Sequence, residues 1–472
     1  MARQLFGREV IYTNQATIDA SNILDVLDNA LSVHAKNRGD IQYLYDYYLG
    51  KQDIWYKTKE FRAEINNIVV ENRANEIVSF KVGYLMGEPV QYINRGEEDK
   101  FDAIRILNDY LYNEDKVAKD RELAEWFTIC GTAYRMILPA TEEDAASPFT
   151  IETLDPRDAY VVRYSGRGKK VVLGGYDVKM DDESILHCVY TDSMYFEVCD
   201  GAILKSEPHA LGRVPIVEYP ANMARLGAFE IVLPLLDAIN EVDSDRVDGI
   251  EQFVQALLML KGVDIEDEDF SKMLQLGGIK IPPDGDVKYL VQELNQTQTQ
   301  TVVDHFYDTV LTICGMPNRN GGLSTSDTGT AVQLRDGWAA AEARAKDTEM
   351  SFARSEKESL RLMLALADQL GESELGLKVS DVEIRFTRRN YENIASKANV
   401  LIEMLNNNKI HPRVAYETCG LFYSPQIPYE EGMAYYEEER RREEEDLNRI
   451  VREGTDSTEE DEDETPDEGS VA

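Results

Sequence analysis

Apolar residues recur at helical spacing through much of the chain and alternate with polar residues in one middle stretch. In residues 15–90 and 101–130 they lie three or four positions apart, which predicts helices joined by short turns. From residue 134 the period changes, and short runs rich in Val, Ile and Tyr are separated by Gly-containing turns, as in antiparallel strands. The runs are 160–164, 170–173, 185–190, 195–199 and 202–205. We therefore expect an α+β domain over residues 1–227.

The longest helical pattern follows, between Gly227 and Gly262. Eight steps along one face, with Arg246 filling a polar gap, cover 29 residues, and 29/8 gives the helical period of about 3.6. The apolar positions are Ile231, Leu235, Ile239, Val242, Ile250, Phe253, Leu257 and Leu260. The opposite face carries Asp237, Glu241, Ser244, Asp248, Glu251 and Gln255. This polar stripe is either a solvated face or a wall that repels a passing anion.

The remaining segments suggest a stalk with a small head, followed by more helix. Residues 263–296 fit a short helix and a two-stranded element, and residues 297–316 fit a second helix. A polar loop is expected over 317–330 and an Ala-rich helix over 331–370. A strand is expected over 382–387, followed by helices to about residue 450. Two helices flanking a small head leave apolar stripes that need neighbours to cover them.

The charge is strongly negative, with 50 Lys and Arg against 88 Asp and Glu, a net charge of −38. This balance argues against ordinary electrostatic capture of nucleic acid, which needs a clustered basic footprint. Residues 430–472 hold 19 acidic residues and five Arg, and we expect residues 451–472 to be a disordered acidic tail. There is no stretch typical of a membrane span or a signal peptide, and five widely spaced cysteines fit a reduced, intracellular chain.

The sequence lacks the motifs of the common catalytic and metal-binding sites. Residues 166–170 (GRGKK) lie in a predicted hairpin rather than before a helix, so they form no phosphate loop. The five histidines show no metal-ligating spacing, and no nucleophile elbow or calcium loop is present. We therefore expect no enzymatic activity, no metal and no cofactor. A metal-dependent nuclease built from scattered carboxylates stays as a weak alternative.

Several blocks, in order and spacing, resemble the phage portal proteins of the SPP1 type. The resemblance spans about residues 40–440 and no block carries it alone. The blocks are YLYDYYLGKQDIWY (43–56), ENRANEIVSFKVGYLMGEPVQY (71–92), LGRVPIVEYPAN (211–222), FEIVLPLLDAINEVDSDRVDGIEQF (229–253), GMPNRNGGLSTSDTGTAVQLR (315–335) and VEIRFTRRNYEN (382–393).

The resemblance implies a portal-like α+β fold, mainly helical, with an antiparallel β-rich wing. Its parts would be the wing (1–227), a stem helix (228–262), the clip (263–296), a second stem helix (297–316), a tunnel loop (317–330), a long helix returning to the wing (331–390) and a helical crown (391–450). The family forms rings, typically of twelve subunits, at one capsid vertex, through which double-stranded DNA passes during packaging and ejection.

The resemblance also implies partners and sites. The partners would be the terminase large subunit, head-completion or adaptor proteins, and the major capsid and scaffolding proteins; the ring would assemble in the bacterial host cytoplasm, without a membrane. The DNA channel would be lined by Asp237, Glu241, Asp248 and Glu251. Tunnel-loop contacts to DNA would come from Arg319, Asn320, Ser324, Thr325, Ser326 and Thr328, and the clip docking surface would include Lys280 and Lys288. The main alternative is a coiled-coil structural or adaptor protein of a viral particle, a dimer to tetramer.

Overall fold

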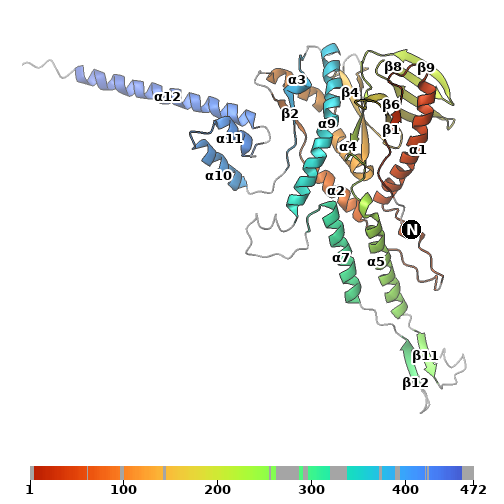
Figure 1. Ribbon diagram of the computed structural model, residues 1–472. Helices are drawn as coiled ribbons and strands as arrows, with labels where there is room; N and C mark the ends of the chain where they lie inside the picture. The colour runs from red at the N-terminus through yellow and green to blue at the C-terminus, as the bar shows by residue number, and fades with distance from the viewer. Residues whose placement is uncertain are drawn as a thin grey trace, which may run out of the picture. The chain divides into compact units, whose positions relative to one another are not determined.

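The computed structural model divides into two compact units, Met1–Arg388 and Arg389–Ala472 (Figure 1). It describes residues 5–60, 62–95, 100–141, 145–254, 257–261, 286–290, 296–318, 337–370, 375–388, 394–419, 421–422 and 425–459. The mixture of helices and an antiparallel β-rich part confirms the predicted α+β class.

The first unit begins with the expected helical part. Its helices are α1 (Ile23–Tyr48), the short 3-10 helix η1 (Asp53–Tyr56), α2 (Arg73–Leu85), α3 (Phe101–Asn113) and α4 (Lys116–Cys130). Gly131 ends α4 with a backbone φ of 84°, and a Cβ there would lie 2.0 Å from the carbonyl oxygen of Arg225. Only glycine fits this position, because the left-handed backbone and the close approach both exclude a side chain.

Among the described residues before 221 there are ten strands, and most of them form two sheets. They are β1 (Ile11–Thr13), β2 (Gln91–Asn94), β3 (Thr132–Pro139), β4 (Phe149–Leu154), β5 (Ala159–Tyr164), β6 (Val171–Lys179), β7 (Ile185–Tyr190), β8 (Met194–Cys199), β9 (Ala202–Pro208) and β10 (Ile216–Pro220). The larger sheet has the order β1-β5-β6-β7-β8-β9, and the smaller one β10-β3-β4. All five predicted runs are strands of the larger sheet, whereas its parallel edge strand β1 was not predicted.

Three apolar clusters hold the first unit together. The largest packs helices α1 to α4 around the smaller sheet, and residues such as Leu107, Phe149 and Phe352 in it are fully buried. A second cluster lies between α1 and the larger sheet, and a third lies between the two sheets. Amphipathic helices thus cover the sheets with their apolar faces, as the period of the sequence indicated.

The two predicted stem helices are present, but the first is shorter than expected. The 3-10 helix η2 (Glu230–Val232) leads into α5 (Leu233–Val254), and α7 (Gln296–Cys314) packs beside α5. Strand β11 (Leu257–Lys261) follows α5 and pairs antiparallel with β12 (Asp286–Leu290). The predicted helix over 228–262 is therefore wrong beyond Val254, because a short apolar run such as LLMLK suits a paired strand as well as a helix.

The buried Arg8–Glu230 pair ties the N-terminal part of the chain to the root of α5. The guanidinium Nη2 of Arg8 lies 2.7 Å from Oε1 of Glu230, and the exposed fractions of the two side chains are 1% and 0%. Glu230 also accepts hydrogen bonds from the backbone N–H groups of Gly7 and Gly227. This carboxylate therefore fixes the point at which the chain leaves the sheets and enters α5.

The remaining elements of the first unit return to the sheets. Helix α9 (Trp338–Leu370) agrees with the predicted Ala-rich helix, and the 3-10 helix η3 (Val379–Asp381) leads into β13 (Val382–Arg385). Strand β13 pairs antiparallel with β2, which joins two segments almost 300 residues apart.

The second unit is helical, as predicted. Its helices are α10 (Ile394–Leu405), α11 (Pro412–Thr418) and α12 (Gln426–Glu459), and Leu401, Ala415 and Cys419 form its small core. Because α12 continues to Glu459, the expectation of a disordered tail from residue 451 is wrong for residues 451–459. The rest of that predicted tail lies outside the described residues.

Candidate functional site

The polar stripe of α5 faces a segment of the same chain. This segment, here called the strap, comprises residues 51–60 and 62–71 and includes η1, which contacts α5. Along the stripe, Asn240 accepts a hydrogen bond of 2.8 Å from the backbone N–H of Glu71, and Ser244 accepts one of 3.0 Å from Val69. Asn240 and Ser244 are fully buried, so this part of the stripe is neither solvated nor open to a passing ligand.

Asp248 is the main anchor of the strap. Its carboxylate lies 2.9 Å from Nζ of Lys57, contacts Nζ of Lys59, and accepts hydrogen bonds of 2.6 and 2.9 Å from the backbone and side chain of Asn67. Burial alone would raise the pKa of Asp248, but the hydrogen bonds from Lys59, Asn67 and Lys57 outweigh it and hold the pKa well below its usual value. The residue is 2% exposed, so the strap covers its carboxylate within the same chain.

The other three predicted channel residues differ in exposure. Asp237 is partly buried and accepts a hydrogen bond of 2.8 Å from the hydroxyl of Tyr47. Burial, helped by the nearby carboxylates of Asp53 and Glu241, raises the pKa of Asp237 to about 6. Glu251 is partly buried and accepts from the Asn67 side chain, whereas Glu241 is exposed. Lining of a DNA channel stays a prediction, and among the four residues Glu241 presents its carboxylate most openly.

Most of the predicted tunnel-loop and clip residues lie outside the described part of the chain. These are Arg319, Asn320, Ser324, Thr325, Ser326, Thr328 and Lys280. Lys288 lies in β12, opposite Met259 of β11. Residues on both sides of the predicted loop are anchored: Lys81 donates a hydrogen bond of 2.8 Å to the carbonyl of Cys314 at the end of α7, and Trp338 at the start of α9 contacts the ring of Phe80.

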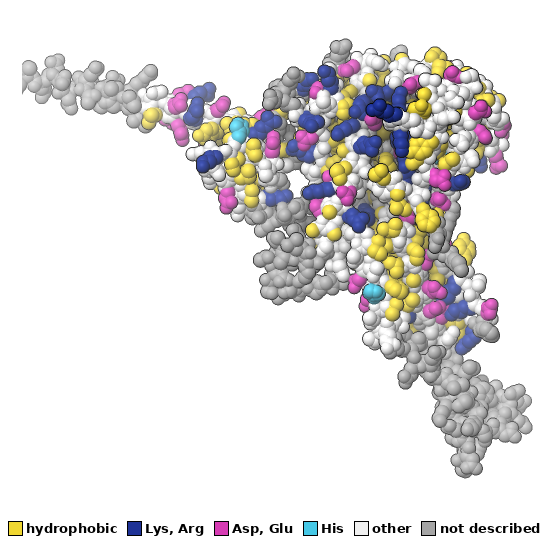
Figure 2. All heavy atoms as spheres, viewed as in Figure 1, with side chains coloured by type: hydrophobic (Ala, Val, Ile, Leu, Met, Phe, Trp, Pro, Cys, Tyr) yellow, Lys and Arg dark blue, Asp and Glu magenta, His cyan; other side chains and the backbone are white. Residues whose placement is uncertain are grey.

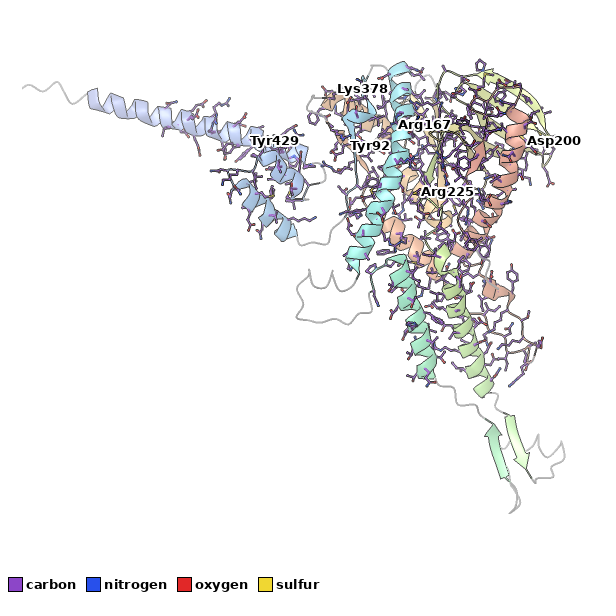
Figure 3. All side chains as sticks on the ribbon, viewed as in Figure 1. Tyr92, Arg167, Asp200, Arg225, Lys378 and Tyr429 are labelled. Carbon is purple, nitrogen blue, oxygen red and sulfur yellow. The ribbon has the colours of Figure 1, made fainter. Side chains whose placement is uncertain are left out.

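A buried charge cluster, which the sequence did not indicate, fixes α9 to the sheets. Glu356 of α9 is fully buried and its carboxylate lies 2.9 Å from Nη1 of Arg135 and 3.1 Å from Nζ of Lys116. The hydroxyl groups of Tyr92, which lies beside α9 in Figure 3, and Tyr219 donate to the same carboxylate at 2.9 and 2.6 Å. Lys116 and Arg135 bring the pKa of Glu356 below its usual value although burial opposes this shift.

The cluster is balanced in charge, because Asp120 also pairs with Lys116 and Arg135, both at 2.5 Å. Two buried cations and two buried anions therefore satisfy one another, which is the condition under which buried charges are tolerated. The only sequence signal was the spacing of Lys116 and Asp120, four residues apart on one helix. Nothing local marked Glu356, because its partners come from four other elements.

A cavity of about 520 Å³ lies between α2, α5 and α7. The guanidinium of Arg73 stacks 3.9 Å above the ring centroid of Tyr307 and pairs with Glu76 at 2.8 Å. On the α5 side, Arg246 lies 3.2 Å from Asp243 and 2.9 Å from the side-chain oxygen of Gln300. The cavity thus combines aromatic and guanidinium surfaces with several carboxylates.

The described residues contain neither a metal-binding cluster nor a membrane-spanning helix. Asp, Glu, His and Cys side chains in this part of the chain form no cluster of three or more that could hold a metal ion. None of the described helices combines the length and the apolar character that a membrane crossing requires.

On sequence comparison, residues 27–446 match the family model described as "Phage portal protein, SPP1 Gp6-like". The portal protein of Bacillus phage SPP1 is 23% identical over 328 residues, which make up 59% of this chain and 61% of that protein. The match thus spans about three fifths of the length of this relative.

Two solved structures of GTA particles are similar at low identity. The chain is 11% identical to one from "Neck of empty GTA particle computed with C6 symmetry", with a TM-score of 0.44, and 9% identical to one from "Neck of native GTA particle computed with C12 symmetry", with a TM-score of 0.42. Both alignments cover 74% of this chain and 90% of the other.

Proposed function

Because the chain belongs to the SPP1 Gp6-like family of phage portal proteins, a family of virion components, we propose that it forms a closed ring at one capsid vertex and conducts double-stranded DNA. The observation that supports this proposal is the family match over residues 27–446, a range that covers α5, α7 and most of the segments predicted as wing and crown. The wider proposal covers genome packaging and ejection by a ring of about twelve subunits that assembles in the host cytoplasm.

The surface of the paired helices α5 and α7 supports assembly with further copies. Figure 2 shows hydrophobic side chains gathered along these two helices on the face turned to the viewer. Val247 and Ile250 of α5, Val302 of α7 and Ile231 of the preceding η2 keep 40% to 53% of their surface exposed. Apolar side chains in such a row are expected to be covered in the functional assembly.

The proposed channel confines DNA without binding it. Every cation offered to a phosphate would add affinity and salt dependence, and would therefore slow the movement of the duplex. The strap lysines Lys57 and Lys59 are already paired with Asp248, so they are poor phosphate ligands, whereas Glu241 is an exposed anion on α5. We assign the repulsive role mainly to Glu241, with Asp237 and Glu251 contributing from partly buried positions.

The remaining predicted contacts belong to the same proposal. The loop residues between α7 and α9 would touch the DNA backbone weakly and without sequence preference. The clip around Lys280 and Lys288 would dock the terminase large subunit and later head-completion proteins. The outer surface of the ring would meet the major capsid and scaffolding proteins during particle assembly.

Electron microscopy of the purified full chain tests the proposal directly. We expect closed rings with a central pore wide enough for a DNA duplex, and sedimentation of a single large species. Dimers to tetramers without a pore would refute the ring and would favour the coiled-coil adaptor. Magnesium-dependent cleavage of DNA by the purified chain would support the nuclease alternative instead.

The role of Glu241 is tested by reversing its charge. We expect rings of Glu241→Lys to bind a short DNA duplex with an affinity that falls steeply with salt, whereas wild-type rings bind little. Asp28→Lys is the matched control, because Asp28 is an exposed acid on α1, far from α5 in the sequence. Equal DNA binding by both variants would show that Glu241 does not face the passage.

A further inference from the structure

Two neighbouring aromatic residues protrude from the strap. Trp55 and Tyr56 end η1 and are 56% and 84% exposed. Their backbone is not loose: the indole N–H of Trp55 donates to the carbonyl of Gly50 at 3.0 Å, and Lys57 next to them pairs with Asp245 of α5 at 2.8 Å. Exposed aromatic side chains on an anchored backbone are enriched in protein interfaces.

The cavity between α2, α5 and α7 lies at the same height along α5, on the opposite side of this helix. Asp245 and Asp248 of α5 hold the strap, whereas Asp243 and Arg246 line the cavity. At about 100° per residue, positions two apart in a helix lie about 160° apart around its axis. In Figure 1, α7 and the part of the strap that carries η1 accordingly lie on opposite flanks of α5, whereas the strap ends at Glu71, which lines the cavity.

The two surfaces differ in the sign of their net charge. Residues 51–62 contain Lys51, Lys57, Lys59 and Arg62 against Asp53 and Glu60, a net charge of +2 within a chain of net charge −38. The cavity is lined by Glu71, Glu76, Asp243 and Asp304 against Arg73 and Arg246, a net charge of −2. Asp245 and Asp248 of the same chain already pair with Lys57 and Lys59, so the cations of this segment that can approach the acidic cavity of a neighbour are the more exposed Lys51 and Arg62.

The chemistry of the cavity suits aromatic side chains that carry a hydrogen-bond donor. The guanidinium groups of Arg73 and Arg246 offer planar cationic surfaces for stacking against an indole or a phenol ring. The carboxylates of Asp243 and Asp304 can accept a hydrogen bond from a tyrosine hydroxyl. A volume of about 520 Å³ is large enough for bulky side chains to enter.

We propose that Trp55 and Tyr56 of one subunit insert into the cavity between α2, α5 and α7 of the next subunit. This inference rests on the proposed ring, because head-to-tail closure requires two different, complementary surfaces on opposite sides of each subunit. The strap then has two contacts: it is anchored to its own α5 through Asp248, and it carries the residues that join the neighbouring copy.

Truncation of Tyr56 tests the energetic part of the proposal. In Tyr56→Ala we expect rings to dissociate at a protein concentration at least tenfold above that of wild type, measured by mass photometry over a dilution series. Tyr112→Ala is the matched control, because Tyr112 on α3 is 82% exposed and is not part of the proposed contact. Since Tyr56 is 84% exposed, the fold itself should keep its wild-type thermal stability.

A disulfide cross-link tests the geometry. Gln300 lies at the rim of the cavity and is exposed, so Tyr56→Cys combined with Gln300→Cys should give a ladder of linked subunits on oxidation. Either single variant should give none, because four of the five native cysteines are buried and the fifth is partly buried. A link within one chain is disfavoured because the two positions lie on opposite sides of α5.

The outcomes separate the two proposals. Rings of the double variant that form no ladder would overturn the insertion and leave the ring intact. A wild-type chain that forms no rings at all would refute the proposed function, and the insertion with it. Rings weakened equally by Tyr56→Ala and Tyr112→Ala would likewise overturn the insertion.

Discussion

Replacing Asp248 by asparagine should release the strap from α5. The substitution keeps the size of the side chain but removes the negative charge that faces Lys57 and Lys59, whose side chains are only 13% and 22% exposed. Breaking a buried ion pair by removing one partner costs about 3–5 kcal/mol. Because both lysines can regain some water, we expect about 2–3 kcal/mol for Asp248→Asn.

The loss should appear locally, as faster hydrogen exchange of strap amides. A cost of about 2–3 kcal/mol corresponds to a roughly 30- to 140-fold faster exchange for amides such as that of Asn67, which donates to Asp248. Hydrogen exchange with mass spectrometry on peptides covering residues 57–71 measures this. Asp245→Asn is the control, because Asp245 is 59% exposed and its pair with Lys57 should contribute less than about 1 kcal/mol.

The same residue predicts the pH dependence of the strap. The folded-state pKa of Asp248 lies well below the unfolded value of about 3.9, so its contribution is fully present above about pH 5 and is lost as the pH falls through the folded pKa. Exchange of the wild-type strap, corrected for the intrinsic rate, should therefore be equal at pH 5 and pH 7. Equal exchange in wild type and Asp248→Asn, or an equal effect of Asp245→Asn, would refute the reasoning.

Three further substitutions test the interior. Glu356→Gln removes one of the two buried anions that face Arg135 and Lys116, leaving Asp120 alone against two buried cations. It should lower the free energy of unfolding by about 3–5 kcal/mol in urea titrations, whereas Glu358→Gln, 54% exposed, should have little effect. The folded-state pKa of Asp237 is raised to about 6, so the wild type loses stability as the pH rises through that value. Asp237→Asn should therefore raise the free energy of unfolding in urea titrations by about 1–2 kcal/mol at pH 7.5 and leave it unchanged at pH 4. Gly131→Ala should lower the melting temperature and lower the free energy of unfolding by more than about 1 kcal/mol, since the alanine Cβ would overlap the carbonyl oxygen of Arg225. Unchanged stability of any of the three variants would contradict the contact described for that residue.

Helical and strand periods predicted most of the fold but not the environment of individual polar residues. The spacing of apolar residues identified α5, α7 and the strands of the larger sheet, because each period reports a buried face. The period could not show that Lys57 and Lys59, about 190 residues earlier, neutralise Asp248, so the polar face of α5 looked open. Long-range pairing of this kind leaves no local pattern.

The same limit applies to the end of α5 and to the core. The apolar run Leu257–Lys261 fits either a helix or a strand. It forms a strand because it pairs with β12, which lies some 25 residues later and is not visible in the local pattern. Glu356 looked like one of many acids on a charged helix, although it is the centre of the buried cluster. The candidate channel could therefore be located on α5 from the sequence, while the exposure of its residues could not.

The Arg8–Glu230 pair sets an order for the folding of the nascent chain. The two residues are 222 positions apart, so the root of α5 cannot be completed while the ribosome is still translating the sheets. At synthesis rates of about 5–20 residues per second, Glu230 is synthesised roughly 10 to 45 s after Arg8. The start of the chain can pair earlier with Asn37 and with β5, but the guanidinium of Arg8 acquires its carboxylate partner only after the strands that separate the two residues have emerged.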